Sequence, residues 1–221
     1  MMGNIAIDGP AGAGKSTIAK MVAKELGFVY VDTGAMYRAM ALHMINNGVQ
    51  TDDASKISST CQSADITIKY ENGEQVVYLN GENVNGKIRT EEVGKMASVS
   101  SANGDVRKKL VELQQKLASE IDVVMDGRDI GTVVLPDALL KVYLTASSRV
   151  RAERRYKELV AKGTECDIDV IEKDIIDRDY RDMHRENSPL MQAEDAVLVD
   201  SSDMTISEVA EKIISLYKER A

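Results

Sequence analysis

A glycine-rich segment near the start of the chain carries the residues best suited to bind phosphate. It runs Ile5-Ala-Ile-Asp-Gly-Pro-Ala-Gly-Ala-Gly-Lys-Ser-Thr17 and matches the pattern G-x-x-x-x-G-K-[ST]. Glycines let successive backbone N–H groups turn inward around an anion, and the start of the following helix adds a positive dipole end. Lysine supplies a charge for the β/γ-phosphates, and the serine hydroxyl is a ligand for Mg²⁺. We therefore predict a nucleoside triphosphate site formed by Gly9, Pro10, Ala11, Gly12, Ala13, Gly14, Lys15, Ser16 and Thr17.

A helix predicted over about 167–186 has an apolar stripe that continues into charged residues. The stripe is Ile168, Ile171 and Ile175, followed on the same face by Arg178, Asp182 and Arg185. Buried charges are tolerated only when paired or hydrogen-bonded, and converging arginines match phosphate geometry. We expect this face to point inward and bind an anion. The alternative is an exposed helix with an Arg178–Asp182 ion pair.

A strongly basic helix is predicted over about 149–162, with arginines at 149, 151, 154 and 155. Phosphoryl transfer needs neutralisation of charge and exclusion of water, because hydrolysis competes. We interpret residues 146–166 or so as a mobile lid, with Arg154 or Arg155 as the arginine that reaches the phosphates. The alternative is that these charges face solvent.

Strands that alternate with helices must position these residues. Buried strands are predicted at 3–8, 28–31, 123–125, 139–144 and 196–199, and helices at 15–26, 35–47, 53–64, 90–102, 105–121 and 207–220. This alternation predicts an α/β fold with a five-stranded parallel sheet flanked by helices. Ligands bind such sheets at the carboxyl ends of the strands, where this chain has Asp8, Asp32, Asp126, Thr145 and Asp200.

The pattern changes over about 63–87, where we predict a small antiparallel β insertion. Residues 65–70 alternate in polarity, Glu71-Asn-Gly-Glu74 is a hairpin signal, and 75–79 form the answering strand. We therefore divide the chain into a core of 1–62 and 88–221 and an insertion of 63–87. The alternative is a hairpin within the main sheet.

The composition limits the partners. The 221-residue chain has a net charge of −8, so no general attraction to nucleic acid polymers or anionic membranes is expected. Two cysteines without a C-x-x-C motif, and the lack of a signal peptide or long apolar run, predict a soluble cytoplasmic protein. No exposed apolar stripe is evident, so we expect a monomer.

Four segments together resemble the bacterial cytidylate kinases. They are the phosphate-binding loop, Asp32-Thr-Gly-Ala-Met-Tyr-Arg38, Asp126-Gly-Arg-Asp-Ile-Gly-Thr132 and Arg178-Asp-Tyr-Arg-Asp-Met-His-Arg185. The resemblance covers nearly the whole chain, including the insertion. It implies a P-loop nucleoside monophosphate kinase that converts ATP and CMP or dCMP to ADP and CDP or dCDP with Mg²⁺, with the insertion on the acceptor-binding side and a helical lid.

The resemblance also implies roles for individual residues. Arg38, Arg128 and Arg185 would hold the acceptor phosphate, Asp182 the sugar hydroxyls, and Ser98, Arg107 and Asp129 the cytosine edge. Thr33 would contact the acceptor at a position where serine is more usual. A carboxylate such as Asp129 suits the exocyclic amine of cytosine. The implied catalytic residues are Lys15, Arg128 and Arg178, with Arg154 or Arg155, while Ser16 would hold Mg²⁺ and Asp126 and Asp32 would order its waters.

Other functions stay open at this point. A kinase of the same core acting on AMP, UMP, dTMP or shikimate would share the phosphate-binding loop. A GTP-dependent switch would need an N-K-x-D motif, which the sequence lacks. Such a switch would also leave the inward arginines unexplained. A nucleotide-binding protein without catalysis is disfavoured because every expected catalytic position is occupied.

Overall fold

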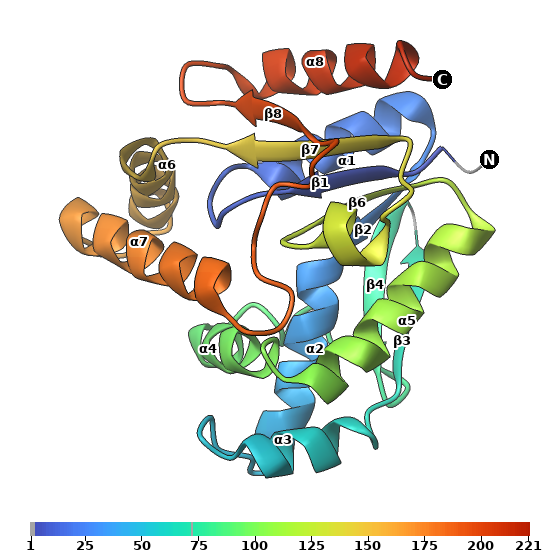
Figure 1. The fold of residues 1–221 in the computed structure, drawn as a ribbon. Helices are drawn as coiled ribbons and strands as arrows, with labels where there is room; N and C mark the ends of the chain where they lie inside the picture. Colours follow the sequence, from blue (N-terminus) through green and yellow to red (C-terminus); the bar gives the residue numbers. More distant parts are fainter. Residues whose placement is uncertain (1–2, 72) are drawn as a thin grey trace. The chain divides into compact units, whose positions relative to one another are not determined.

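The computed structural model describes residues 3–71 and 73–221, and the chain divides into two compact units, each described by itself. The first unit comprises Met1–Tyr30 and Ile121–Ala221, and the second comprises Val31–Glu120. The elements of the first are β1 (Ile5–Asp8), α1 (Lys15–Leu26), the start of β2 (Val29–Asp32), β6 (Val123–Gly127), η1 (Ile130–Val134), β7 (Leu140–Thr145), α6 (Ser148–Ala161), α7 (Ile168–His184), β8 (Val197–Asp200) and α8 (Ile206–Lys218). All of them except η1 are labelled in Figure 1. The predicted division into a core and an insertion stays a prediction.

A five-stranded sheet with the order β2-β6-β1-β7-β8 forms the centre of the first unit. β1 pairs in parallel with both β6 and β7, and β7 pairs in parallel with β8. The predicted parallel sheet is confirmed. In this register Asp8 lies beside Gly127 and Tyr143, and Thr145 lies beside Asp200, so the carboxyl ends of the strands share one edge.

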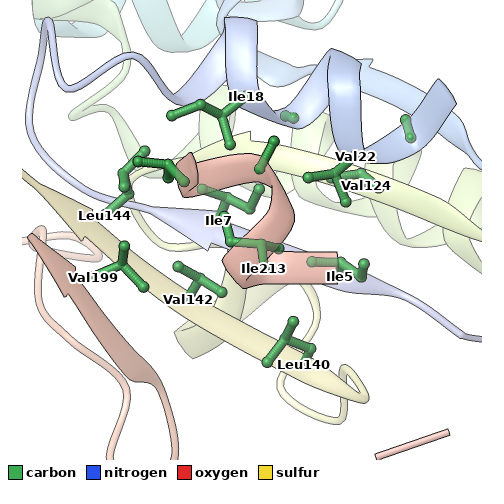
Figure 2. Close-up of a cluster of buried hydrophobic side chains, with 14 of the residues drawn as sticks. Ile5, Ile7, Ile18, Val22, Val124, Leu140, Val142, Leu144, Val199 and Ile213 are labelled. Atoms are coloured by element: carbon green, nitrogen blue, oxygen red, sulfur yellow. The ribbon is translucent and has the colours of Figure 1, made fainter. Parts of the chain in front are cut away.

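The core of the first unit lies between this sheet and the pair α1 and α8, which pack against each other. Figure 2 shows Ile18 and Val22 of α1 and Ile213 of α8 beside Ile5 and Ile7 of β1. All five side chains are at most 2% exposed. Helical spacing of the apolar residues in α1 produces this packing and holds the start of α1 in a fixed place at the edge of the sheet.

The second unit contains α2 (Thr33–Asn46), α3 (Ala54–Cys61), β3 (Ile66–Glu71), β4 (Glu74–Leu79), β5 (Glu82–Asn83), α4 (Glu91–Ser100) and α5 (Gly104–Glu120). β3 and β4 form an antiparallel hairpin in register from Ile66 and Leu79 to Glu71 and Glu74, and β5 extends it to a three-stranded sheet. The predicted antiparallel piece is confirmed, and the alternative of a hairpin within the main sheet is wrong. Asn72 of the predicted turn lies outside the described residues.

Two elements were not predicted from the sequence. β5 is only two residues long. η1 is a five-residue π-helix in which the Val133 N–H donates to the Asp129 carbonyl at 2.9 Å and the Leu135 N–H donates to the Ile130 carbonyl at 2.6 Å. A single π-type turn is too short to produce a periodic pattern, so its position depends on contacts with other parts of the chain.

In the described part of the chain, no helix combines the length and the apolar character needed to cross a bilayer.

We predict that Ile213→Ala lowers the free energy of unfolding by about 2–5 kcal/mol, because it leaves a cavity between α1, α8 and the sheet. Urea denaturation measures the change. Ile206→Ala is the matched control on the same helix, since Ile206 is 51% exposed and should change stability by about 0.5 kcal/mol or less. Equal losses in the two variants would contradict this description of the core.

Candidate active site

The phosphate-binding loop connects β1 to α1 and depends on glycine at two of its positions. Gly9 has a φ of 148°, and a Cβ there would lie 1.9 Å from the Leu144 carbonyl oxygen of β7. Gly14 occupies the N-cap position of α1 with a φ of 86°. Larger residues would strain the backbone at both positions and push the loop away from the sheet. The local sequence therefore dictates a tight loop that ends in the amide groups of a helix start.

Lys15 is a buried cation directly after this loop. Lys15 is only 6% exposed, and its Nζ donates a hydrogen bond of 2.7 Å to the Pro10 carbonyl. Burial lowers the pKa of Lys15 well below its usual range, and the charge of Arg128 lowers it further, whereas Asp126 and Asp8 raise it. Arg178 is also close enough to lower the pKa. The convergence of these cations favours an anion at this place.

Ser16, Asp126 and Tyr30 form a hydrogen-bonded group next to Lys15. The Ser16 hydroxyl donates to Asp126 Oδ2 at 2.9 Å, and the Tyr30 hydroxyl donates to Asp126 Oδ1 at 2.8 Å. Because the Ser16 hydroxyl directs its proton at Asp126, the lone pairs of its oxygen can bind a cation. Hydroxyl and carboxylate oxygens are the ligands that Mg²⁺ prefers, so this donor set fits the metal.

Arg178 and Asp182 lie on the inward face of α7, as predicted from the sequence, whereas Arg185 is the C-cap residue of this helix and has an extended backbone. Arg178 and Arg185 are half-buried and Asp182 is buried, whereas the opposite face exposes Val170, Ile176 and Tyr180. Asp182 Oδ2 accepts a hydrogen bond of 2.9 Å from Arg128 Nε, and Asp182 is 9% exposed, so this face is not the solvent-exposed face of the alternative. Arg185 Nη2 lies 3.6 Å from Asp129 Oδ1. The segment after β6 and the helix α7 thus form one network of charges.

Arg151 of α6 is a residue that sequence reasoning missed. It is 5% exposed, donates from Nη1 to the Ala11 carbonyl in the phosphate-binding loop at 2.9 Å, and its Nη2 pairs with Asp179 Oδ2 at 2.7 Å. The predicted lid arginines have other contacts: Arg154 donates to Ser201 and Arg155 to Glu158. Four arginines share this helix, and their spacing alone did not indicate which one contacts the loop.

Asp8 is a buried carboxylate at the end of β1. Its Oδ1 accepts from the Ile130 N–H and its Oδ2 from the Gly131 N–H, both at 2.7 Å. Burial raises the pKa of Asp8 from 3.8 to about 6, and the charge of Asp129 raises it as well, whereas the two backbone hydrogen bonds and Lys15 lower it. This residue links the strand before the phosphate-binding loop to the segment that carries Arg128 and Asp129.

The second unit positions Asp32 at the start of α2. Asp32 Oδ1 caps the helix by accepting from the Ala35 N–H at 2.9 Å, and its Oδ2 accepts from Arg89 at 2.6 Å. Gln75 of β4 bonds both backbone groups of Asp32, accepting from its N–H at 2.7 Å and donating to its carbonyl at 3.2 Å. The antiparallel sheet is thereby tied to the end of β2.

Four of the residues implied to bind the acceptor lie in this second unit. Thr33 is buried in the first turn of α2. Arg38 on the same helix lies beside Gly94, where a Cβ would come within 3.1 Å of its Nη1. Arg107 is 5% exposed, donates to the Ser101 carbonyl at 3.3 Å, and stands 5.8 Å from the centre of the Tyr37 ring. Ser98 is half-buried on α4. The other four, Arg128, Asp129, Asp182 and Arg185, lie in the first unit.

The fold and the phosphate-binding loop define the class of the protein as an α/β protein with a P-loop. The structure is similar to a gluconokinase from Sinorhizobium meliloti 1021, with a TM-score of 0.52 and 14% identity over 98% of this chain and 92% of the other. It is also similar to an uncharacterized protein from Eubacterium ventriosum, with a TM-score of 0.56 and 12% identity over the whole of both chains. At these identities the similarity concerns the fold alone.

The sequence comparisons give the family. The family model for cytidylate kinase matches residues 5–219. Similar curated proteins are the cytidylate kinases of Caldicellulosiruptor saccharolyticus, 51% identical over 97% of this chain and 95% of the relative, and of Streptococcus pneumoniae Hungary19A-6, 50% identical over 95% and 94%. The chain belongs to the cytidylate kinase family. The resemblance seen in the sequence is confirmed.

We predict that Arg151→Met lowers the free energy of unfolding by about 3 kcal/mol, because Asp179 then remains as an unpaired buried charge. Adding Asp179→Asn should recover part of this loss. Arg155→Met is the control on the same helix and should cost less than about 1 kcal/mol, since its ion pair with Glu158 is exposed. Additive losses from Arg151→Met and Asp179→Asn in a double-mutant cycle would contradict the pairing.

We predict that the stability gained from Asp8 increases as the pH falls. Between about pH 4 and pH 6 the folded chain holds a proton that the unfolded chain has released, because the pKa is about 6 when folded. The unfolding free energy of the unmodified protein minus that of Asp8→Asn should therefore rise by about 2.4 kcal/mol from pH 7 to pH 4. Urea denaturation across this range measures the difference, and a constant or falling difference would show that the pKa is not raised.

Proposed function

We propose that this chain transfers the γ-phosphoryl group of ATP to CMP or dCMP and releases ADP and CDP or dCDP, in pyrimidine nucleotide metabolism. Membership of the cytidylate kinase family supports the acceptor, and the phosphate-binding loop supports the donor. The observation that carries the proposal is the convergence of Lys15, Arg128 and Arg178 at the carboxyl edge of the parallel sheet. Three cations at one buried place match the charge of the phosphates of a donor and an acceptor.

The reaction needs no nucleophile from the protein. The acceptor phosphate attacks the γ-phosphorus in line, and catalysis consists of positioning and charge stabilisation. We assign Gly9 to Thr17 to the phosphates of ATP, Lys15 to the charge between the β- and γ-phosphates, and Arg128 and Arg178 to the transferred group. Arg154 and Arg155 stay predicted lid residues; we add Arg151, because its contact with the Ala11 carbonyl supports the loop.

Mg²⁺ is the metal that we propose for this site. Ser16 would be its ligand. Asp126 would accept the hydrogen bond of the Ser16 hydroxyl and order the waters of the metal. A role for Asp32 through water stays a prediction, since its carboxylate caps α2 and pairs with Arg89. The metal would neutralise phosphate charge when it is bound.

For the acceptor we propose the roles that the sequence implied. Arg38, Arg128 and Arg185 would hold the phosphate and Asp182 the ribose hydroxyls, with Thr33 as a further contact. The base edge would be read by Ser98, Arg107 and Asp129. ATP and CMP or dCMP are the proposed partners, and we propose a cytoplasmic monomer that binds neither a nucleic acid polymer nor a membrane.

The test is a coupled assay of diphosphate formation with Mg·ATP and, separately, CMP, dCMP, UMP, AMP and GMP. We expect rapid turnover of CMP and dCMP, with UMP well behind them, and Lys15→Ala should abolish turnover while the fold survives in circular dichroism. Preference for another monophosphate would require new assignments for the base-reading residues. Turnover close to normal in Lys15→Ala would refute the role of the phosphate-binding loop.

A further prediction concerns the choice of base. Asp129→Asn should lower kcat/KM for CMP about 100-fold and change that for UMP much less, because a neutral amide accepts from the cytosine amine more weakly than a charged carboxylate does and can donate to the O4 of uracil. The ratio of the two kcat/KM values measures the effect. An equal loss with both acceptors would show that Asp129 acts on the shared phosphate or sugar.

A further inference from the structure

The turn η1 has its N-terminal amides satisfied in an unusual way. Asp129 occupies the N-cap position of η1, and aspartate there ordinarily accepts from the second or third amide of the turn. In this structure the Asp129 side chain makes no capping hydrogen bond. The Ile130 and Gly131 amides donate instead to the two oxygens of Asp8, which is 122 and 123 residues away in the chain.

The carboxylates of Asp8 and Asp129 are therefore alternative acceptors for the same amide N–H. The Gly131 N–H, the second of the turn, is the natural target of an aspartate at the N-cap, and Asp8 Oδ2 holds it at 2.7 Å. The two carboxylates are also close enough for the charge of Asp129 to raise the pKa of Asp8. Occupied amides and like charge both oppose rotation of the Asp129 side chain into the capping position.

The hydrogen bonds from the Ile130 and Gly131 amides to Asp8 are short and shielded from solvent. Asp8 is 5% exposed and Asp129 is 4% exposed. Gly131 has no side chain, and a Cβ at this position would lie 3.3 Å from Asp8 Oδ2 and 3.2 Å from Lys141 Cδ. Asp129 Oδ1, in contrast, lies 3.6 Å from Arg185 on the inward face of α7.

We propose that Asp8 is a positioning residue for acceptor specificity, which caps η1 in place of Asp129 and so keeps the Asp129 carboxylate directed at the cytosine base. The inference rests on the proposed function, in which Asp129 reads the base. It adds a residue of β1, the strand before the phosphate-binding loop, to the residues that determine acceptor specificity. Asp8 itself touches no substrate in this account and acts through Asp129.

The consequence of losing the carboxylate can be stated for the isosteric Asp8→Asn. Asparagine offers one oxygen acceptor and a donor group, so one of the two amides loses its partner. An unsatisfied buried amide costs free energy, and the Asp129 carboxylate is the nearest capping group of the ordinary kind. Rotation of Asp129 toward Gly131 would relieve that cost and withdraw the carboxylate from the base.

The experiment compares kcat/KM for CMP and UMP in the unmodified protein, Asp8→Asn, Asp129→Asn and the double variant. We expect Asp8→Asn to lower the CMP-to-UMP ratio about tenfold and to change the KM for ATP less than about threefold. In the Asp129→Asn background the same substitution should change the ratio less than about twofold, because the residue it positions is gone. Asp8→Ser serves as a second variant, and circular dichroism checks that each protein is folded.

The outcomes separate this inference from the proposed function. If the unmodified protein does not prefer CMP to UMP, the proposed function fails, and this inference fails with it. If the unmodified protein does prefer CMP, but Asp8→Asn lowers kcat/KM equally for CMP and UMP or raises mainly the KM for ATP, only the role of Asp8 is overturned. The role of Asp8 would also be overturned if Asp8→Asn changed the CMP-to-UMP ratio by the same factor in the unmodified protein and in Asp129→Asn. Failure of both Asp8 variants to fold would also overturn it, since Asp8 would then be required for the fold itself.

Discussion

The burial of charge at the carboxyl edge of the parallel sheet is the constraint on which the rest of the first unit depends. Lys15 is buried beside Arg128 and Arg178, and its pKa is lowered because burial and the neighbouring arginine charges disfavour its charged form. Such an arrangement costs stability, and the apolar packing of β1 and β7 with α1 and α8 offsets that cost. A rigid core is needed because a flexible one would let the cations move apart or become hydrated.

The arginines of the site differ in what their carboxylate partners do. Arg151 has its charge compensated by Asp179 and donates to the loop carbonyl of Ala11, so it supports the backbone of the loop that we propose to bind phosphate. Arg128 is paired with Asp182, whose oxygens are suited to hydroxyl groups of a sugar as well. A partner that arrives can therefore exchange contacts with the protein's own pairs.

Much of the fold and part of the site could be predicted from the sequence. The strands and helices of the first unit, the antiparallel hairpin and the inward face of α7 follow from hydrophobic period and turn residues, which are local signals. Arg151 could not be singled out, because the residues that select it, Ala11 and Asp179, are distant in the chain. η1 was missed for a similar reason. Its capping groups come from β1, and no local pattern records them.

The aspartate at position 129 shows why a local rule fails where function is concentrated. Taken alone, an aspartate before a short turn predicts a cap, and the most stable use of its carboxylate would be to bind the amides that follow. In the proposed function Asp129 reads the base, and a carboxylate used in this way cannot also serve as the cap. The chain resolves this conflict with a second carboxylate on the neighbouring strand, at the cost of burying Asp8 with a pKa raised to about 6. Violation of a local preference, together with a distant compensating group, marks a position selected for chemistry over stability.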